Sequence, residues 1–288
     1  MISIPDPNSV TRVADWVELS ISVANSSLSR TALTSALEMS GGNEPSETLI
    51  ASVWHELERR QHLYSRPLYR VEDRTVERET DEQPPEYLAC LLLSLYGVQG
   101  DTQLPPKLFE RLTCEAVRYY LSGLATVFGW PFDPEDRESV EEEQQELQIK
   151  RKIRRLAEDL GERFVEAPLS PFKKDRGIDI VGWIPFREKR SGQVVVLLQC
   201  AAGHNWVIKR PVPLDAWREY IHWGCCPIIA FSIPCIISER DWHDTSKDNG
   251  ILFDRVRIVN LLSEGIRDQA LNQDLSTWVQ QQLANLED

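Results

Sequence analysis

Two apolar segments in the second half of the chain each carry an oxygen-bearing side chain that could bind a divalent cation. Asp179 lies in the segment 177–181 (GIDIV), and Gln199 lies near the end of 194–201 (VVVLLQCA). Apolar residues of this kind predict two β-strands. If the strands are neighbours, the two side chains could share a metal ion beside a phosphodiester, where the metal would activate water. The sequence therefore suggests a nuclease.

The elements expected to position these residues form a sheet covered by helices. The second half predicts strands at 177–183, 193–200, 227–233 and 255–261, a turn at 185–192, and helices at 215–223 and 274–286. This order predicts an α/β domain with a central mixed sheet flanked by helices.

The first half has the apolar spacing of helices. Helices are predicted at 10–23, 46–63, 85–96 and 105–128. Ser46 is expected to be an N-cap, and Gly97 and Gly129 are expected to end two of the helices. The polar, alternating segment 68–78 predicts either a short exposed strand or a loop.

A domain boundary is expected near 129–134, where two prolines and a glycine precede a strongly charged run. We therefore predict an acidic, all-helical domain over residues 1–135 and an α/β domain over residues 136–288. The run from 138 to 164 passes from acidic to basic and contains spaced apolar residues, which predicts one continuous helix.

The charge of the chain is unevenly placed. Residues 1–150 hold 13 basic and 26 acidic side chains, and residues 151–288 hold 19 of each, so the net charge of -13 belongs to the first half. This charge argues against a protein that coats nucleic acid, although basic clusters in the second half could engage phosphates. If the protein binds DNA, we expect it to bind weakly alone.

The sequence also favours a cytoplasmic protein with reduced thiols. No apolar run approaches the ~20 residues needed to span a bilayer, and the first residues lack the pattern of a secretory signal. The cysteines show neither CxxC spacing nor the density of a disulfide scaffold, so we expect buried, reduced thiols and no structural zinc. This expectation includes the adjacent Cys225 and Cys226.

The order of these segments resembles the restriction-endonuclease-like PD-(D/E)xK superfamily, in particular its Mrr-like branch. In that branch a helix glutamate precedes an Asp strand and a Gln-x-Lys strand. The matching segments are 160–164 (LGERF), 177–181 and 197–201 (LLQCA), and the resemblance covers about residues 148–240. It implies a DNA endonuclease that depends on Mg²⁺ or Mn²⁺, and it says nothing about residues 1–135.

The resemblance implies a role for each matched residue. Asp179 and Gln199 would supply oxygens to the metal, the carbonyl of Cys200 would complete the ligand set, and Glu162 would face the metal from the preceding helix. Each side chain also has an ordinary alternative. Asp179 could cap a turn or pair with Arg176, Gln199 could satisfy strand-edge hydrogen bonds, and Glu162 could be an exposed carboxylate.

The sequence departs from the family pattern at the lysine. The position two residues after Gln199 is Ala201, which cannot stabilise charge on a phosphate. Lys209 is the first candidate to replace it, because a turn at Gly203 could bring the following segment back across the strand end. His204, which can transfer a proton near neutral pH, is the second candidate.

Three hypotheses follow. The leading one is a gated DNA endonuclease, whose acidic half docks a protein partner or repels DNA at rest. By family analogy the partner would be an ATPase or sensor subunit in a bacterial anti-phage defence system, and a homo-oligomer is also compatible. The second is a catalytically inactive nuclease-like scaffold, favoured by Ala201. The third is a helical adaptor with an unrelated α/β domain, which a wide separation of Asp179 and Gln199 would support.

Overall fold

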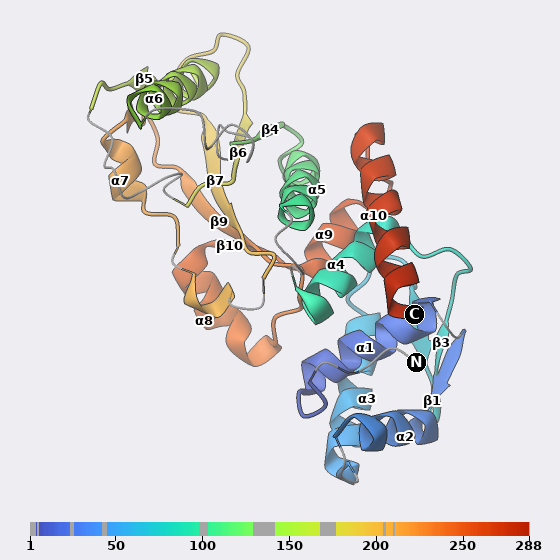
Figure 1. Ribbon diagram of the computed structural model, residues 1–288. Coiled ribbons are helices and arrows are strands. Elements are labelled where there is room, and N and C mark those ends of the chain that lie inside the picture. The colour runs from blue at the N-terminus through green and yellow to red at the C-terminus, as the bar shows by residue number, and fades with distance from the viewer. Residues whose placement is uncertain are drawn as a thin grey trace.

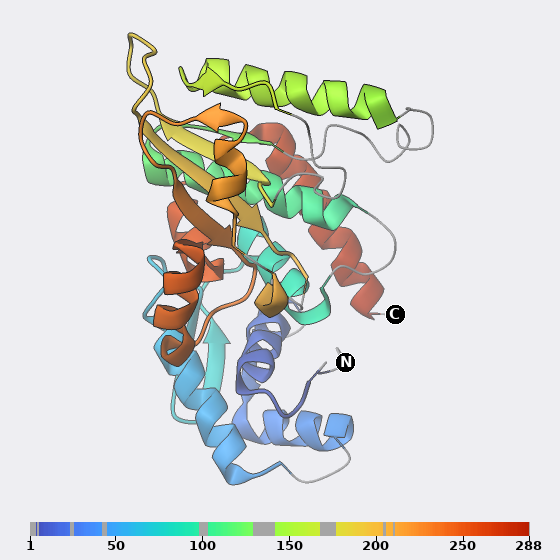
Figure 2. The same cartoon turned by 90° about the vertical axis from the view of Figure 1, so that its left-hand side faces the viewer.

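The protein is a mixed α and β molecule in which helices surround a five-stranded sheet (Figures 1 and 2). The computed structural model describes residues 4, 6–23, 26–41, 45–97, 103–128, 142–167, 177–203, 206–209 and 211–287. The helices are α1 (Val10–Val23), α2 (Arg30–Gly41), α3 (Glu47–Gln61), α4 (Pro85–Tyr96), α5 (Leu104–Leu121), α6 (Glu142–Asp159), η2 (Trp206–Ile208), α7 (Leu214–Arg218), α8 (Glu239–Asn249), α9 (Arg255–Leu261) and α10 (Gln269–Glu287). The strands are β1 (Ser27–Ser29), β2 (Tyr69–Val71), β3 (Thr75–Arg78), β4 (Leu124–Val127), β5 (Arg163–Phe164), β6 (Ile180–Ile184), β7 (Val194–Cys200), β8 (Ile221–His222), β9 (Ile228–Ser232) and β10 (Ile251–Phe253).

The five-stranded sheet has the order β10-β9-β7-β6-β4. Strand β6 is antiparallel to both β4 and β7, whereas β7, β9 and β10 run parallel. Parallel neighbours need a crossover connection, and α7 and α8 lie in the two connections that precede β9 and β10. The predicted mixed sheet is therefore present, and the predicted strands at 177–183, 193–200 and 227–233 correspond to β6, β7 and β9.

The two faces of this sheet bury alternate side chains against different helices. Ile180 and Leu198 join the large core that includes α1, α4, α5 and α9, whereas Val181 and Leu197 join a second core with α6. This alternation is the period of two expected for strands that are buried on both faces. Helices α5 and α6 therefore cover opposite faces of β6 and β7 (Figure 1).

The first half of the chain is not all-helical, which corrects the prediction for residues 1–135. Strands β1, β3 and β2 form a three-stranded antiparallel sheet, and the 68–78 segment supplies two of these strands. The predicted helix 105–128 ends at Leu121, and the chain then forms β4 on the main sheet. This turn needs glycine at position 123, because a Cβ on any other residue there would lie 2.5 Å from the carbonyl oxygen of Trp183.

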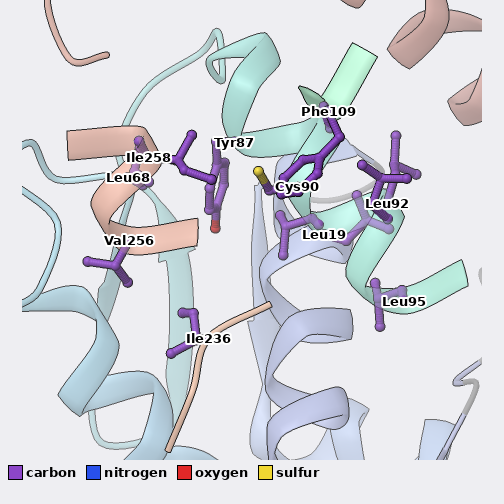
Figure 3. Packing of buried hydrophobic residues seen from close by; sticks show 14 of the residues in the cluster. Leu19, Leu68, Tyr87, Cys90, Leu92, Leu95, Phe109, Ile236, Val256 and Ile258 are labelled. Carbon is purple, nitrogen blue, oxygen red and sulfur yellow. The ribbon is translucent and has the colours of Figure 1, made fainter. Parts of the chain in front are cut away.

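Elements from both sides of the predicted 135/136 boundary share one core. Helices α4 and α5 pack against α9 and α10 from the far end of the chain. Figure 3 shows this packing, with Leu19, Tyr87 and Phe109 from the first half beside Val256 and Ile258 from α9. The boundary itself falls outside the described residues, and the sheet and its covering helices do not divide along it.

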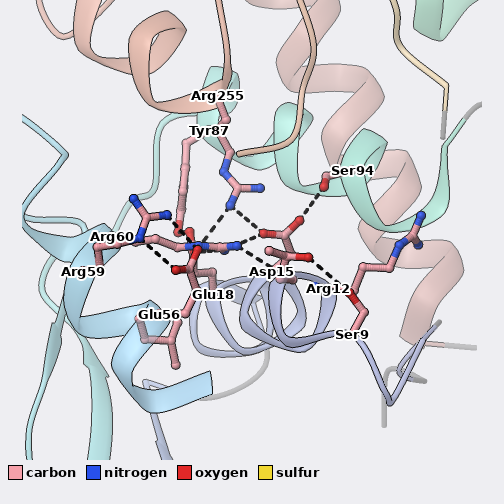
Figure 4. Close-up of polar contacts among 12 residues, drawn as sticks. Ser9, Arg12, Asp15, Glu18, Glu56, Arg59, Arg60, Tyr87, Ser94 and Arg255 are labelled. Carbon is pink, nitrogen blue, oxygen red and sulfur yellow. Dashed lines mark hydrogen bonds and ion pairs between the residues drawn. The ribbon is translucent and has the colours of Figure 1, made fainter. Parts of the chain in front are cut away.

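A buried cluster of charges joins α1, α3 and α9 (Figure 4). Arg60 Nη1 donates to Asp15 Oδ1 at 2.6 Å and to Glu18 Oε1 at 2.7 Å, and Arg255 Nη2 donates to the same Asp15 oxygen at 2.7 Å. Ser94 donates to the other oxygen of Asp15. Burial alone would raise the pKa of Asp15, but the two guanidinium groups outweigh it and lower that pKa to about 2. The cluster therefore ties distant parts of the chain together.

The predicted strand at 255–261 is wrong, because these residues form helix α9. Asp254 is its N-cap and accepts a hydrogen bond from the Arg257 amide at 3.0 Å. Val256, Ile258 and Val259 are buried in the main core. Helix α9 packs on α4 and α5, so tertiary packing overrides the β preference of the valine and isoleucine residues.

The predicted burial of all six cysteines is also wrong in part. All six have free thiols, but Cys225 and Cys226 are exposed in the segment between β8 and β9. The apolar run that begins at Cys225 enters the sheet only at Ile228. No helix within the described ranges is both long and apolar enough to cross a membrane.

Candidate active site

Asp179 is fixed at the point where the chain enters β6. Its backbone N–H donates to the Leu198 carbonyl at 2.9 Å, and its own carbonyl accepts from the Phe128 N–H at 2.7 Å. Its side-chain Oδ2 accepts from the Cys200 N–H at 2.6 Å. The carboxylate is therefore held across the end of β7, and part of its hydrogen-bonding capacity serves the backbone.

Gln199 lies on the neighbouring strand at the same end of the sheet. Ile180 pairs with Leu198, so Asp179 and Gln199 stand one residue beyond that pair and project toward the same face. The side-chain Oε1 of Gln199 is buried and has no hydrogen-bond partner among the described residues. An amide oxygen buried without a partner is costly, which makes this atom a candidate ligand for a cation.

Gly177 shapes the backbone next to Gln199. It has a φ of +73°, a conformation that residues with a Cβ rarely adopt, and a Cβ there would lie 3.2 Å from Gln199 Nε2. Glycine thus lets the chain turn tightly beside the amide before it reaches Asp179. The tight turn at Gly177 therefore brings Asp179 next to Gln199.

Lys209 returns to the end of β7, although it lies nine residues after Cys200 in the sequence. The chain leaves β7, passes through the short helix η2, and places Lys209 Nζ 2.8 Å from the Cys200 carbonyl oxygen. The ammonium thus lies at the carbonyl that the sequence assigned to the metal. A positive charge there opposes a second cation at the same oxygen, so we remove the Cys200 carbonyl from the expected ligands.

Ala201 has a structural explanation. Its side chain is fully buried in a small apolar core with Phe231, Ile233 and Leu252. A lysine at this position would have to place its ammonium within that core, and an unpaired buried charge is strongly unfavourable. The packing around Ala201 therefore excludes a lysine at this position.

Glu162 does not join Asp179 and Gln199, which corrects its predicted position. It follows α6 and is buried, and its two oxygens accept from the Gly192 N–H at 3.1 Å and the Gly224 N–H at 2.8 Å. Gly192 precedes the start of β7, whereas Gln199 lies at its end, a separation of about 20 Å at ~3.3 Å per residue. Glu162 therefore holds two turns together. His204, the other predicted candidate, lies outside the described residues.

Two charged residues near Asp179 were missed by the sequence interpretation. Burial raises the pKa of the Cys200 thiol well above its usual value, and the charges of Asp179 and Glu110 add to the rise while Lys209 opposes it. Glu110, on α5, also acts on Lys152 of α6. Glu110 therefore belongs to the surroundings of Cys200, and Lys152 belongs to the surroundings of Glu110. The available signal was that α5 precedes the Asp strand, as the helix glutamate of the resembled family does.

The donor set of this site is small for a metal centre. Within the described part of the chain, no cluster of three or more His, Cys, Asp or Glu side chains is arranged to hold a metal ion. The oxygen-bearing side chains considered for this site are the Asp179 carboxylate, the Gln199 amide and the carboxylate of Glu110. Mg²⁺ is commonly held by one or two carboxylates together with water and substrate phosphate, so these residues fit a site completed by substrate.

Comparison with known protein families, with curated proteins and with solved structures finds no match for this chain.

Proposed function

We propose that the protein is a metal-dependent DNA endonuclease whose active site lies where β6 begins and β7 ends. The observation that carries the proposal is the buried, unpartnered Oε1 of Gln199 on the strand next to Asp179, with the ammonium of Lys209 nearby. A carboxylate and an amide oxygen can hold a metal ion, and a nearby cation can stabilise charge on a phosphate, which together suit phosphodiester hydrolysis. The proposal includes a restriction-endonuclease-like arrangement of the sheet around this site.

Each residue of the proposed active site would have a distinct role. Asp179, Gln199 and Glu110 would hold Mg²⁺ or Mn²⁺, with Glu110 taking the role that the sequence gave to Glu162. The metal would lower the pKa of an attacking water and neutralise charge on the leaving oxygen. Lys209 would orient the end of β7 through the Cys200 carbonyl and place a positive charge near the substrate.

The proposal extends to gating by a partner. The first half of the chain carries the whole of the net negative charge, and a surface of this sign repels a nucleic acid. A partner that covers or displaces the acidic elements would raise DNA affinity. We therefore retain the proposal of an effector subunit of a defence system that works with an ATPase or sensor subunit, and of activity in the cytoplasm.

Cleavage assays with a charge-only variant provide the test. Asp179→Asn keeps an oxygen that can accept from the Cys200 N–H but removes the negative charge, so it should fold normally. Plasmid and single-stranded DNA would be incubated with Mg²⁺ or Mn²⁺, with and without the products of neighbouring genes. We expect Asp179→Asn to reduce cleavage by about 100-fold or more, because loss of a metal ligand should cost at least as much as loss of its supporting residues.

The matched control is Asp248→Asn, which removes a carboxylate from the exposed face of α8. It should cleave like the wild type. Gln199→Ala and Lys209→Ala complete the series and should each be impaired. Undiminished cleavage by both Asp179→Asn and Gln199→Ala would show that the active site is not at this sheet end.

A non-catalytic scaffold is the second candidate. It is favoured by the apolar burial of Ala201 and by the hydrogen bond that Asp179 makes to the backbone, since both are structural roles. The scaffold predicts no cleavage under any of these conditions together with binding of a partner. The endonuclease predicts metal-dependent cleavage that the Asp179→Asn variant loses.

A further inference from the structure

Lys152 lies on the face of α6 that packs against the sheet. It is half-buried and lies three residues after Ile149 and four before Leu156, on the stripe that packs against the sheet. Arg151 and Arg155, its neighbours in the basic run, are exposed. The stem of Lys152 therefore runs along the apolar face, and its charged end must reach the edge of that face.

The charged end of Lys152 lies over the ring of Phe128, the residue next to Asp179 across the sheet. Its Nζ is 5.2 Å from the centre of the Phe128 ring, and the backbone N–H of Phe128 donates to the Asp179 carbonyl at 2.7 Å. Burial disfavours the ammonium form and lowers the pKa of Lys152, whereas the Glu110 carboxylate opposes that shift. A half-buried cation therefore lies within electrostatic range of the Glu110 carboxylate, over the ring of the residue that hydrogen-bonds to Asp179.

This placement has a consequence for substrate binding. The carboxylates of Asp179 and Glu110 repel a phosphodiester, and the Lys209 ammonium donates to the Cys200 carbonyl. A phosphate that approaches Asp179 needs positive charge to offset the repulsion. Lys152 reaches this region from α6, on the face of the sheet to which Asp179 and Gln199 project.

We propose that Lys152 binds a phosphate of the nucleic-acid backbone next to Asp179. This inference rests on the proposed nuclease function, and it makes Lys152 a substrate-binding residue supplied by a helix that lies outside the strands carrying Asp179 and Gln199. Lysine is suited to this role because its ammonium acts as a compact point charge with three donors.

The test uses Lys152→Met, which keeps an apolar stem of similar length and removes the charge. The control is Arg151→Met, an equal loss of charge at the adjacent exposed position. Binding of a short DNA duplex would be measured by fluorescence anisotropy over a range of salt concentrations without added metal. We expect Lys152→Met to weaken binding about tenfold and to reduce the slope of log K against log salt by about 1, as the loss of one phosphate contact predicts.

Cleavage by the same variants separates this inference from the proposed function. We expect Lys152→Met to lose activity and Lys152→Arg to recover part of it, with the thermal melting of both unchanged. If the wild type cleaves DNA and Lys152→Met binds and cleaves as Arg151→Met does, the inference is overturned and the nuclease proposal stands. If the wild type does not cleave, the proposed function fails. The slope of log K against log salt for DNA binding then still decides whether Lys152 contacts a phosphate. A wild type that binds no DNA would overturn the inference as well.

Discussion

The Arg255→Met substitution probes the buried charge cluster that joins the two ends of the chain. The Arg255 side chain is 0% exposed, and its guanidinium contacts Asp15 Oδ1 at 2.7 Å, Glu18 Oε1 at 3.4 Å and the Tyr64 hydroxyl at 3.2 Å. Methionine fills a similar volume but leaves two buried carboxylates to share Arg60. Removing one partner from a buried ion pair typically costs about 3–5 kcal/mol.

That loss is a large part of the total stability, because folded domains are typically stable by only about 5–15 kcal/mol. Equilibrium unfolding in urea would measure it by circular dichroism and by tryptophan fluorescence. With a slope of about 3 kcal/mol per molar urea, a loss of ~3 kcal/mol lowers the unfolding midpoint by about 1 M.

Arg257→Met is the matched control on the same helix. Arg257 is exposed, donates to the Leu252 carbonyl at 2.8 Å and lies over the Trp242 ring, so its loss should cost about 1 kcal/mol or less. An Arg255→Met protein that unfolds at the same urea concentration as Arg257→Met would refute the view that this cluster holds α1, α3 and α9 together.

Three further predictions concern single residues. The folded-state pKa of Asp15, about 2, lies below the ordinary value of 3.8. Ionised Asp15 therefore adds about 2 kcal/mol of stability above pH 4, and this stability is lost as the pH falls toward 2. Acid unfolding of the wild type and of Asp15→Asn, compared side by side, measures the loss. Glu162→Gln should cost about 1–3 kcal/mol in thermal unfolding, because it weakens two amide contacts, yet it should leave the cleavage rate of folded protein unchanged. Gly177→Ala should impair cleavage, because the new Cβ adds strain of about 1–2 kcal/mol at a positive φ and contacts Gln199. Gly192→Ala is the control: it is strained at φ +86° as well, but its Cβ has open space, so cleavage should be unchanged.

The sequence predicted the parts of the site that depend on local pattern. The apolar runs around Asp179 and Gln199 located β6 and β7 because strands buried on both faces are nearly continuous in apolar residues. The return of Lys209 to the end of β7 was likewise expected from the turn at Gly203. That the two strands are adjacent follows from the sheet order.

The parts that failed depend on long-range packing. Glu162 was assigned to the site because it precedes Asp179, but α6 ends at Asp159, so Glu162 lies beyond the helix and turns toward the far end of β7. Glu110 was overlooked because α5 was read as part of a separate helical domain. Helix α5 reaches this sheet through the pairing of β4 with β6 and through its own packing on β6 and β7, and no local pattern predicts either.

A crystal of the protein soaked in Mn²⁺ tests the central claim most directly. Anomalous scattering would locate the ion, and the proposed function predicts a peak within coordination distance, about 2.2 Å, of Asp179 and of Gln199 Oε1. The Asp179→Asn crystal should lose that peak. An ordered ion bound elsewhere, or no ion at concentrations that support cleavage, would contradict the assignment of this sheet end as a metal-dependent active site.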